Sequence, residues 1–170
     1  VDRNGDGQIT EADRYFLHSP MPDYYMGFSS QFRYKQFDLG FNLRANIGNY
    51  SYNELAASNS TSANAYSGMG FLNNLHEAIF DTRFTLSNSS EQKLSDYFLE
   101  DASFLKMDNI TLGYSFRNFL SSKLSGRLSF SVQNVFTITK YKGLDPENAG
   151  VDNDLWPRPQ VYTLGVNLNF

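Results

Sequence analysis

Strict alternation of apolar and polar residues over stretches of about ten residues is the feature that most restricts the fold. In the last stretch of the chain the apolar parity is complete and consists of Tyr162, Leu164, Val166, Leu168 and Phe170, opposite small or polar residues. The stretch from Phe37 to Gly48 repeats the pattern, with Asp38 and Arg44 on its polar parity. Because successive side chains of a strand point to opposite faces, each stretch predicts a strand with one apolar face.

Three further stretches, 25–34, 104–116 and 125–138, alternate in the same way, and Asn134 is the one polar residue on the apolar parity of the third. We therefore expect five strands, joined by short turns at 34–36 and 117–125 and by long loops at 51–103 and 139–160. A weak helical spacing also allows a short helix near 71–80. Tilted strands of this length, with short and long connections in alternation, are typical of outer-membrane β-barrels.

A calcium-stabilised surface adhesin or lectin-like β-sandwich is the alternative interpretation. The two differ in the surroundings of one apolar face, which consists of Phe37, Leu39, Phe41 and Leu43 in its first half. In a barrel these side chains face lipid, whereas in a sandwich a second sheet buries them.

Composition narrows the function classes. Aromatic residues make up 16% of the chain although the mean hydropathy is −0.45, as expected if only one side of many strands is apolar. The net charge of −4, with no basic cluster and no glycine-rich phosphate loop, gives no support for a nucleic-acid partner. There are no cysteines, and His18 and His76 have no partner at catalytic or metal-ligand spacing, so we do not expect an enzyme.

The first residues resemble an EF-hand calcium loop. The expected oxygen ligands are Asp2, Asn4, Asp6, the backbone carbonyl of Gln8, and Asp13, with Gly7 at the sharp turn. A hard cation needs several oxygens that converge from a short turn, and this spacing provides them. Because Asp replaces the usual Glu at the last position, we expect a structural calcium ion rather than a sensor.

Several motifs resemble the C-terminal region of the SusC/RagA family, the TonB-linked outer-membrane transporters of Bacteroidetes. They are Ser95–Lys106, Asn109–Tyr114, Gln133–Phe136 and Tyr141–Glu147, together with the opening Asp-x-Asn-Gly-Asp-Gly and the final Gly-x-Asn-Leu-x-Phe. The resemblance covers nearly the whole chain, in the order found in the family.

The resemblance implies an all-β fold, a transmembrane antiparallel β-barrel of about 22 strands. Residues 25–170 would be its last five strands and residues 1–24 an extracellular loop with the calcium motif. The remaining N-terminal part of the barrel, with the plug and the TonB-contacting segment, would precede Val1. The long loops would be extracellular and the C-terminus periplasmic, with Phe170 similar to the terminal aromatic signal of outer-membrane barrels.

The implied function is TonB-dependent import of oligosaccharides or oligopeptides across the bacterial outer membrane, with TonB and a SusD-like surface lipoprotein as partners. Ligand contacts are expected from the outward residues Tyr66, Phe71 and Trp156. Asp38, Arg44 and Arg127 are expected to form ion pairs on the barrel wall or to contact the plug.

Overall fold

The computed structural model describes residues 2–8, 10–61, 65, 72, 74–82, 95–119, 124–153 and 156–169. The main strands are β1 (Tyr24–Tyr34), β2 (Phe37–Ile47), β5 (Phe104–Phe119), β6 (Leu124–Thr139) and β7 (Val161–Asn169). The smaller elements are η1 (Glu11–Asp13), β3 (Tyr50–Tyr52), α1 (Glu54–Asn59), α2 (Ile79–Thr82), η3 (Asp96–Phe98) and β4 (Leu99–Asp101).

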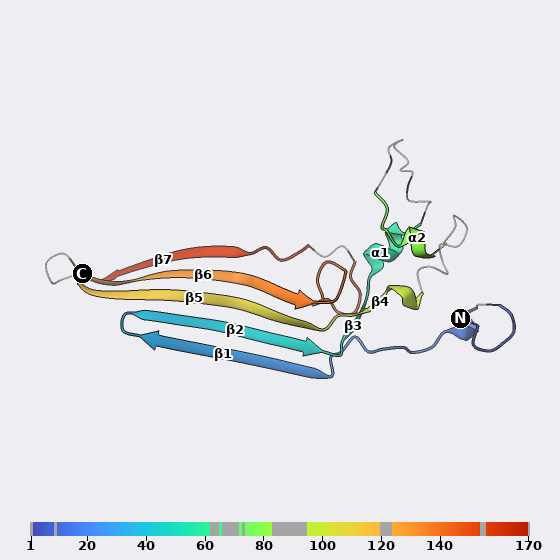
Figure 1. Cartoon of the computed structure of the whole chain (residues 1–170), viewed down its shortest axis with the longest axis horizontal. Coiled ribbons are helices and arrows are strands. Elements are labelled where there is room, and N and C mark those ends of the chain that lie inside the picture. Colours follow the sequence, from blue (N-terminus) through green and yellow to red (C-terminus); the bar gives the residue numbers. More distant parts are fainter. Residues whose placement is uncertain are drawn as a thin grey trace.

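The five long strands form one antiparallel sheet in the order β1-β2-β5-β6-β7 (Figure 1), which confirms the five strands expected from the alternation. A tight turn with Lys35 at a φ of 53° joins β1 to β2, as predicted. The final strand pairs with β6, and Phe130 lies opposite Leu164. The turn expected at 117–125 is shorter than predicted, because β5 continues to Phe119 and β6 begins at Leu124.

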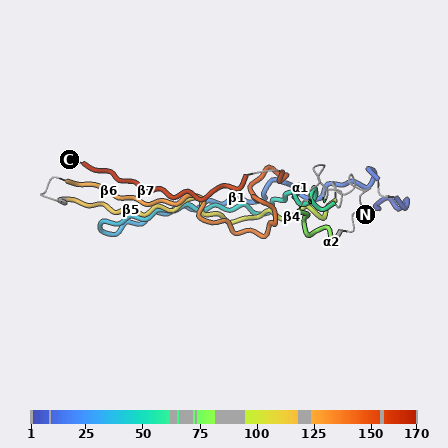
Figure 2. Tube along the Cα trace, turned by 90° about the horizontal axis from the view of Figure 1, so that it is seen from above, coloured from blue at the N-terminus to red at the C-terminus, as the bar shows by residue number. Residues whose placement is uncertain are grey.

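All long connections lie at one end of the sheet, which we call the loop end, and the short ones lie at the opposite turn end (Figure 1). The sheet is a single extended layer, as Figure 2 shows edge-on. Its apolar face is open: Phe28 is 58% exposed, Phe37 50% and Leu164 75%. Among the described residues no second sheet covers this face, which is the arrangement expected for a barrel segment and not for a β-sandwich.

A β-bulge at Asp108 changes the parity of β5. Asn42 pairs with Asn109 and Leu43 pairs with Met107, so β5 carries one residue more than β2 at this point. Bulges re-aim side chains in this way. As a result Met107 lies in the apolar row with Leu43, while the next residue, Lys106, lies opposite Arg44 on the polar face.

Strand β6 has its own bulge beside this one. Gln133 pairs with Asn109 and Phe136 with Met107, so three steps along β6 match two along β5. Asn134, expected as the one polar residue of the apolar face, lies in this bulge with a φ of 52°. Its side-chain N–H donates to the Pro159 carbonyl at 2.9 Å, so the residue anchors the start of β7.

A small module of short elements stands at the loop end. Helix α1 begins after Asn53, whose side-chain oxygen accepts from the Ala56 N–H at 3.0 Å. Its core consists of Ala56, Ala57, Ala78 and Phe98. Of the helix expected near 71–80, only the last two residues are helical, in the short α2 that starts at Ile79, and the other described residues of that range form no helix. Of the helices described, none is both long and apolar enough to cross a bilayer.

Candidate functional site

The polar face of the five-stranded sheet is the candidate functional surface. Strand alternation aims side chains from all five strands to this side, and strand pairing lines them up in rows across the sheet. One row joins Ser29, Asn42, Asn109 and Gln133, and the next joins Gln31, Gly40, Thr111, Ser131 and Thr163. The middle of the face therefore carries amides and hydroxyls without charge.

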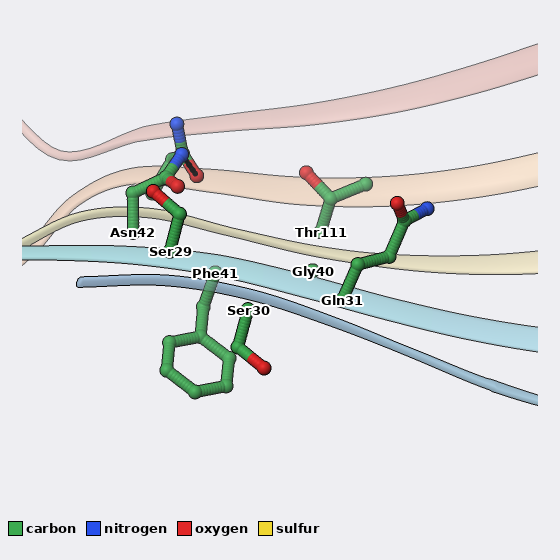
Figure 3. A pocket seen from close by; sticks show the side chains of 8 residues that line it. Ser29, Ser30, Gln31, Gly40, Phe41, Asn42 and Thr111 are labelled. Atoms are coloured by element: carbon green, nitrogen blue, oxygen red, sulfur yellow. Dashed lines mark hydrogen bonds between the residues drawn. The ribbon is translucent and has the colours of Figure 1, made fainter.

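A hollow of about 400 Å³ lies over these two rows. Figure 3 shows Ser29, Gln31, Asn42 and Thr111 projecting to one side of the strands, with Phe41 and Ser30 on the opposite side. Asn42 donates a side-chain hydrogen bond to Asn109 at 3.0 Å. Such groups can both donate and accept hydrogen bonds, so this part of the face suits a neutral polar solute or water.

Towards the loop end, the polar face carries a dense group of charges, which we call the Glu147 cluster. It consists of Arg44, Lys106, Asp108, Asp145, Glu147 and Arg158. The Arg44 guanidinium holds Asp108 through Nε at 2.7 Å and holds Glu147 through both terminal nitrogens. Two-point contacts of this kind fix geometry as well as charge.

Glu147 also binds Lys106 at 3.2 Å and Arg158 at 2.9 Å. Burial raises the pKa of Glu147, but the hydrogen bonds from Arg44 and Lys106 outweigh it, so the pKa lies below its ordinary value. Glu147 is therefore an anion at neutral pH.

A separate ion pair lies nearer the turn end. Arg127 on β6 donates to Asp38 on β2, and the pair crosses over the intervening strand β5 at Gly113. A Cβ atom at Gly113 would overlap atoms of both side chains. The ion pairs expected for Asp38, Arg44 and Arg127 are therefore present within this chain.

Hydrogen bonds from backbone N–H groups to carboxylates hold the expected calcium loop in a compact turn. The carboxylate of Asp2 accepts from the N–H groups of Gly5 and Gly7, at 2.7 and 2.8 Å, and Gly7 has the positive φ, 83°, that its turn position requires. The Asp13 carboxylate accepts from Thr10, Arg3 and Asn4, and these backbone hydrogen bonds lower its pKa.

The donor types suit a hard cation, and Asn4 and Asp6 lie between the two ends of the loop. The side chains are turned onto backbone N–H groups, and among the described residues no three His, Cys, Asp or Glu side chains converge on one point.

Of the three residues expected to contact the ligand, the structure describes one. Tyr66 and Phe71 lie outside the described residues. Trp156 is 92% exposed at the loop end, so its ring is free for stacking. A second hollow, of about 360 Å³, lies in the module there and is lined in part by Tyr97, Glu100 and Lys140.

Sequence reasoning missed most of the Glu147 cluster. Lys106 and Asp108 join the polar face only because of the bulge in β5, and Glu147 comes from a loop. The Tyr141–Glu147 motif marked the segment but not its partners. Arg44 and Glu147 are 103 residues apart in the chain, which no local pattern can relate.

Comparison with known proteins gives relatives of one kind. The chain is 41% identical over 177 residues to the TonB-dependent receptor SusC of Bacteroides thetaiotaomicron, with all of this chain and 17% of that protein covered. It is 31% identical over 194 residues to the TonB-dependent receptor P3 of Formosa agariphila, covering 18% of it. The chain thus spans less than a fifth of the length of these two relatives. No protein-family model matches it.

Solved structures share the fold. The RagAB peptide importer in its open-open state superposes with a TM-score of 0.68 at 24% identity, over 90% of this chain and 18% of that one. Its closed-closed state gives a TM-score of 0.69 at 22% identity, over 97% of this chain and 20% of that one. The sheet described above is therefore of the kind found in that importer.

Proposed function

Because the chain belongs to the SusC/RagA family of TonB-dependent receptors, we propose that the whole protein imports a nutrient across the bacterial outer membrane. In this proposal the apolar face contacts lipid and the polar face lines the aqueous passage. The long connections face outward and the short turns face the periplasm. The relatives named above are receptors, and no catalytic step forms part of the proposal.

The observation that carries the proposal is the contrast between the two faces of one sheet. Among the residues that the structure describes, no layer covers Phe28, Leu164 and their neighbours on one face. The other face is polar over all five strands. A single layer with these faces needs lipid on one side and water on the other.

For the cargo we propose a neutral oligosaccharide, with an oligopeptide as the second candidate. The uncharged row of Ser29, Asn42 and Asn109 favours a solute that hydrogen-bonds without carrying charge. In support of the second candidate, the structural relative is described as a peptide importer. Exposed Trp156 would stack on the cargo at the entrance.

Uptake by cells that express the full-length protein tests both parts. We expect a labelled neutral oligosaccharide to enter, and its entry to stop when the proton-motive force that drives TonB is dissipated. Entry of a labelled oligopeptide alone would reverse the choice of cargo, and entry of neither above a deletion strain would refute import. Trp156→Ala should weaken binding of the cargo, with Tyr34→Ala, an exposed ring at the opposite, turn end of the sheet, as the matched control.

We further propose a SusD-like lipoprotein as the partner that covers the loop end. Its support is the family itself and the exposed aromatic rings there, among them Phe16, Phe80 and Trp156. Affinity purification of the tagged full-length protein in mild detergent should bring down a lipoprotein in equal amount. Recovery of the receptor alone would contradict this.

We also propose that the loop from Asp2 to Asp13 holds a structural calcium ion through Asp2, Asn4, Asp6, Gln8 and Asp13. The donors are oxygens in EF-hand order, and the glycine turn is already formed. Calcium titration of the full-length protein by calorimetry should give a site that Asp2→Asn removes and that Glu11→Gln leaves intact. An identical titration for Asp2→Asn would show that the loop is only a turn.

A further inference from the structure

The connection between β6 and β7, residues 140–160, reaches further than a hairpin loop needs to. The two strands it joins are neighbours in the sheet, so the loop could stand clear of every other strand. Instead Glu147 binds Arg44 on β2, which lies two strands away from β6, and it binds Lys106 on β5 on the way. In Figure 1 this connection curls beside the ends of β5 and β6.

The contact is stronger than an ordinary surface pair. The Lys106 side chain is 5% exposed and that of Glu147 21%, so water screens the charges little. The acids Asp108, Asp145 and Glu147 face the bases Arg44, Lys106 and Arg158, so the charges balance. Each carboxylate therefore has a cationic partner when the loop lies on the wall, and Glu147 would lose the two that belong to the wall, Arg44 and Lys106, if the loop swung away.

Two further sets of hydrogen bonds hold the connection. In its middle Ser51 donates to Asn148 at 2.6 Å, and the Tyr52 N–H donates to the Gly150 carbonyl at 2.9 Å. At its C-terminal end Gln160 donates to the Val135 carbonyl in the β6 bulge at 2.8 Å. The connection is therefore held at Glu147, just after it, and where β7 begins.

We propose that the 140–160 connection is an inward-folded loop that narrows the passage along the polar face, and that Glu147 is the positioning residue that holds it there. This inference rests on the proposed function, because it takes the polar face to line the passage. A solute moving from the loop end to the hollow at Thr111 must then pass Arg44 and Arg158, whose side chains are 33% and 48% exposed.

Thiol labelling measures such a narrowing without a known cargo. A cysteine-free version of the full-length protein receives Thr111→Cys, in the hollow beyond the cluster. Intact cells are then treated with a small trimethylammonium-ethyl methanethiosulfonate or with a bulky methanethiosulfonate linked to biotin through polyethylene glycol. The labelling rates are compared with and without Glu147→Gln, and Asp38→Asn serves as the matched control because it removes an acid from the same face near the turn end.

We expect the small reagent to label all three proteins at similar rates. The bulky reagent should label the Glu147→Gln protein about tenfold faster than its parent, since the loss of charge-assisted hydrogen bonds shifts the loop by at least this factor. The Asp38→Asn protein should behave like its parent. If the bulky reagent labels Thr111→Cys at equal rates with and without Glu147→Gln, the inference is overturned while the proposed import function stands. If the small reagent fails to label Thr111→Cys in every variant, the polar face does not line the passage and the proposed function is refuted.

A distance measurement keeps the inference testable if Glu147→Gln assembles poorly in cells. Nitroxides at Ala149 on the connection and Ser131 on the wall should give one narrow distance distribution in detergent. Glu147→Gln should broaden and lengthen it and Asp38→Asn should not. An unchanged distribution in the Glu147→Gln protein would overturn the positioning role.

Discussion

Gly113 lies beneath the Asp38–Arg127 ion pair. A side chain at this position should therefore separate the two charged groups while both residues stay unchanged. Alanine adds one Cβ atom, which would overlap both the carboxylate and the guanidinium. No left-handed conformation is required at Gly113. The cost therefore comes from displacing the pair and not from backbone strain.

The size of the effect follows from the exposure of the two partners. The Arg127 side chain is 45% exposed, so the pair itself contributes no more than about 1 kcal/mol after screening by solvent. The Asp38 side chain is only 11% exposed, and leaving it without its donor adds about 1–2 kcal/mol. We expect Gly113→Ala to lower the free energy of unfolding by about 1–3 kcal/mol.

Urea unfolding of the full-length protein in lipid vesicles measures this difference. The matched control is Gly27→Ala on the same face, where nothing lies within 4 Å of the added atom, and which should change stability by less than about 1 kcal/mol. In an Asp38→Ala background the cost of Gly113→Ala should largely disappear, because no ion pair is left to displace and the half-exposed Arg127 side chain can turn into solvent. Equal stabilities for the two glycine variants, or a full cost in the Asp38→Ala background, would refute the reasoning.

Three further outcomes are expected. Phe41→Lys places a charge on the apolar face, which we propose contacts lipid, and should cost about 2–4 kcal/mol in the same unfolding assay, whereas Thr111→Lys on the polar face should cost about 1 kcal/mol or less; equal costs would favour a soluble sheet. The pKa of Glu147 is held below its ordinary value of 4.5, so the ion pairs that hold the 140–160 connection should be complete above that pH. They should be lost as the pH falls through the lowered value. The nitroxide distance distribution should broaden over that range in the parent and stay constant in Glu147→Gln. Asp13→Ala removes the acceptor of three backbone N–H groups and should speed proteolysis at residues 2–14 several-fold, whereas Glu11→Ala, in an exposed pair, should not.

The bulge in β5 explains why the alternation of apolar and polar residues breaks at Lys106 and Asp108. Counting back from Ile110 in steps of two places Asp108 and Lys106 among the apolar side chains, which would be costly in lipid. The bulge removes this conflict by turning both onto the polar face, where Arg44 and Glu147 meet them. An apparent break in alternation thus marks the place where a loop is anchored.

The five strands, their two faces, the tight turn at Lys35 and the glycine turn of the Asp2–Asp13 loop are determined by sequence alone. Each depends on residues close together in the chain, because side-chain direction alternates every residue and turn residues act locally. The Glu147 cluster and the Asp38–Arg127 pair were decided only by the tertiary structure. They join residues 103 and 89 positions apart, and their contacts depend on strand register and on a one-residue bulge, since a shift of one residue moves every side chain to the opposite face.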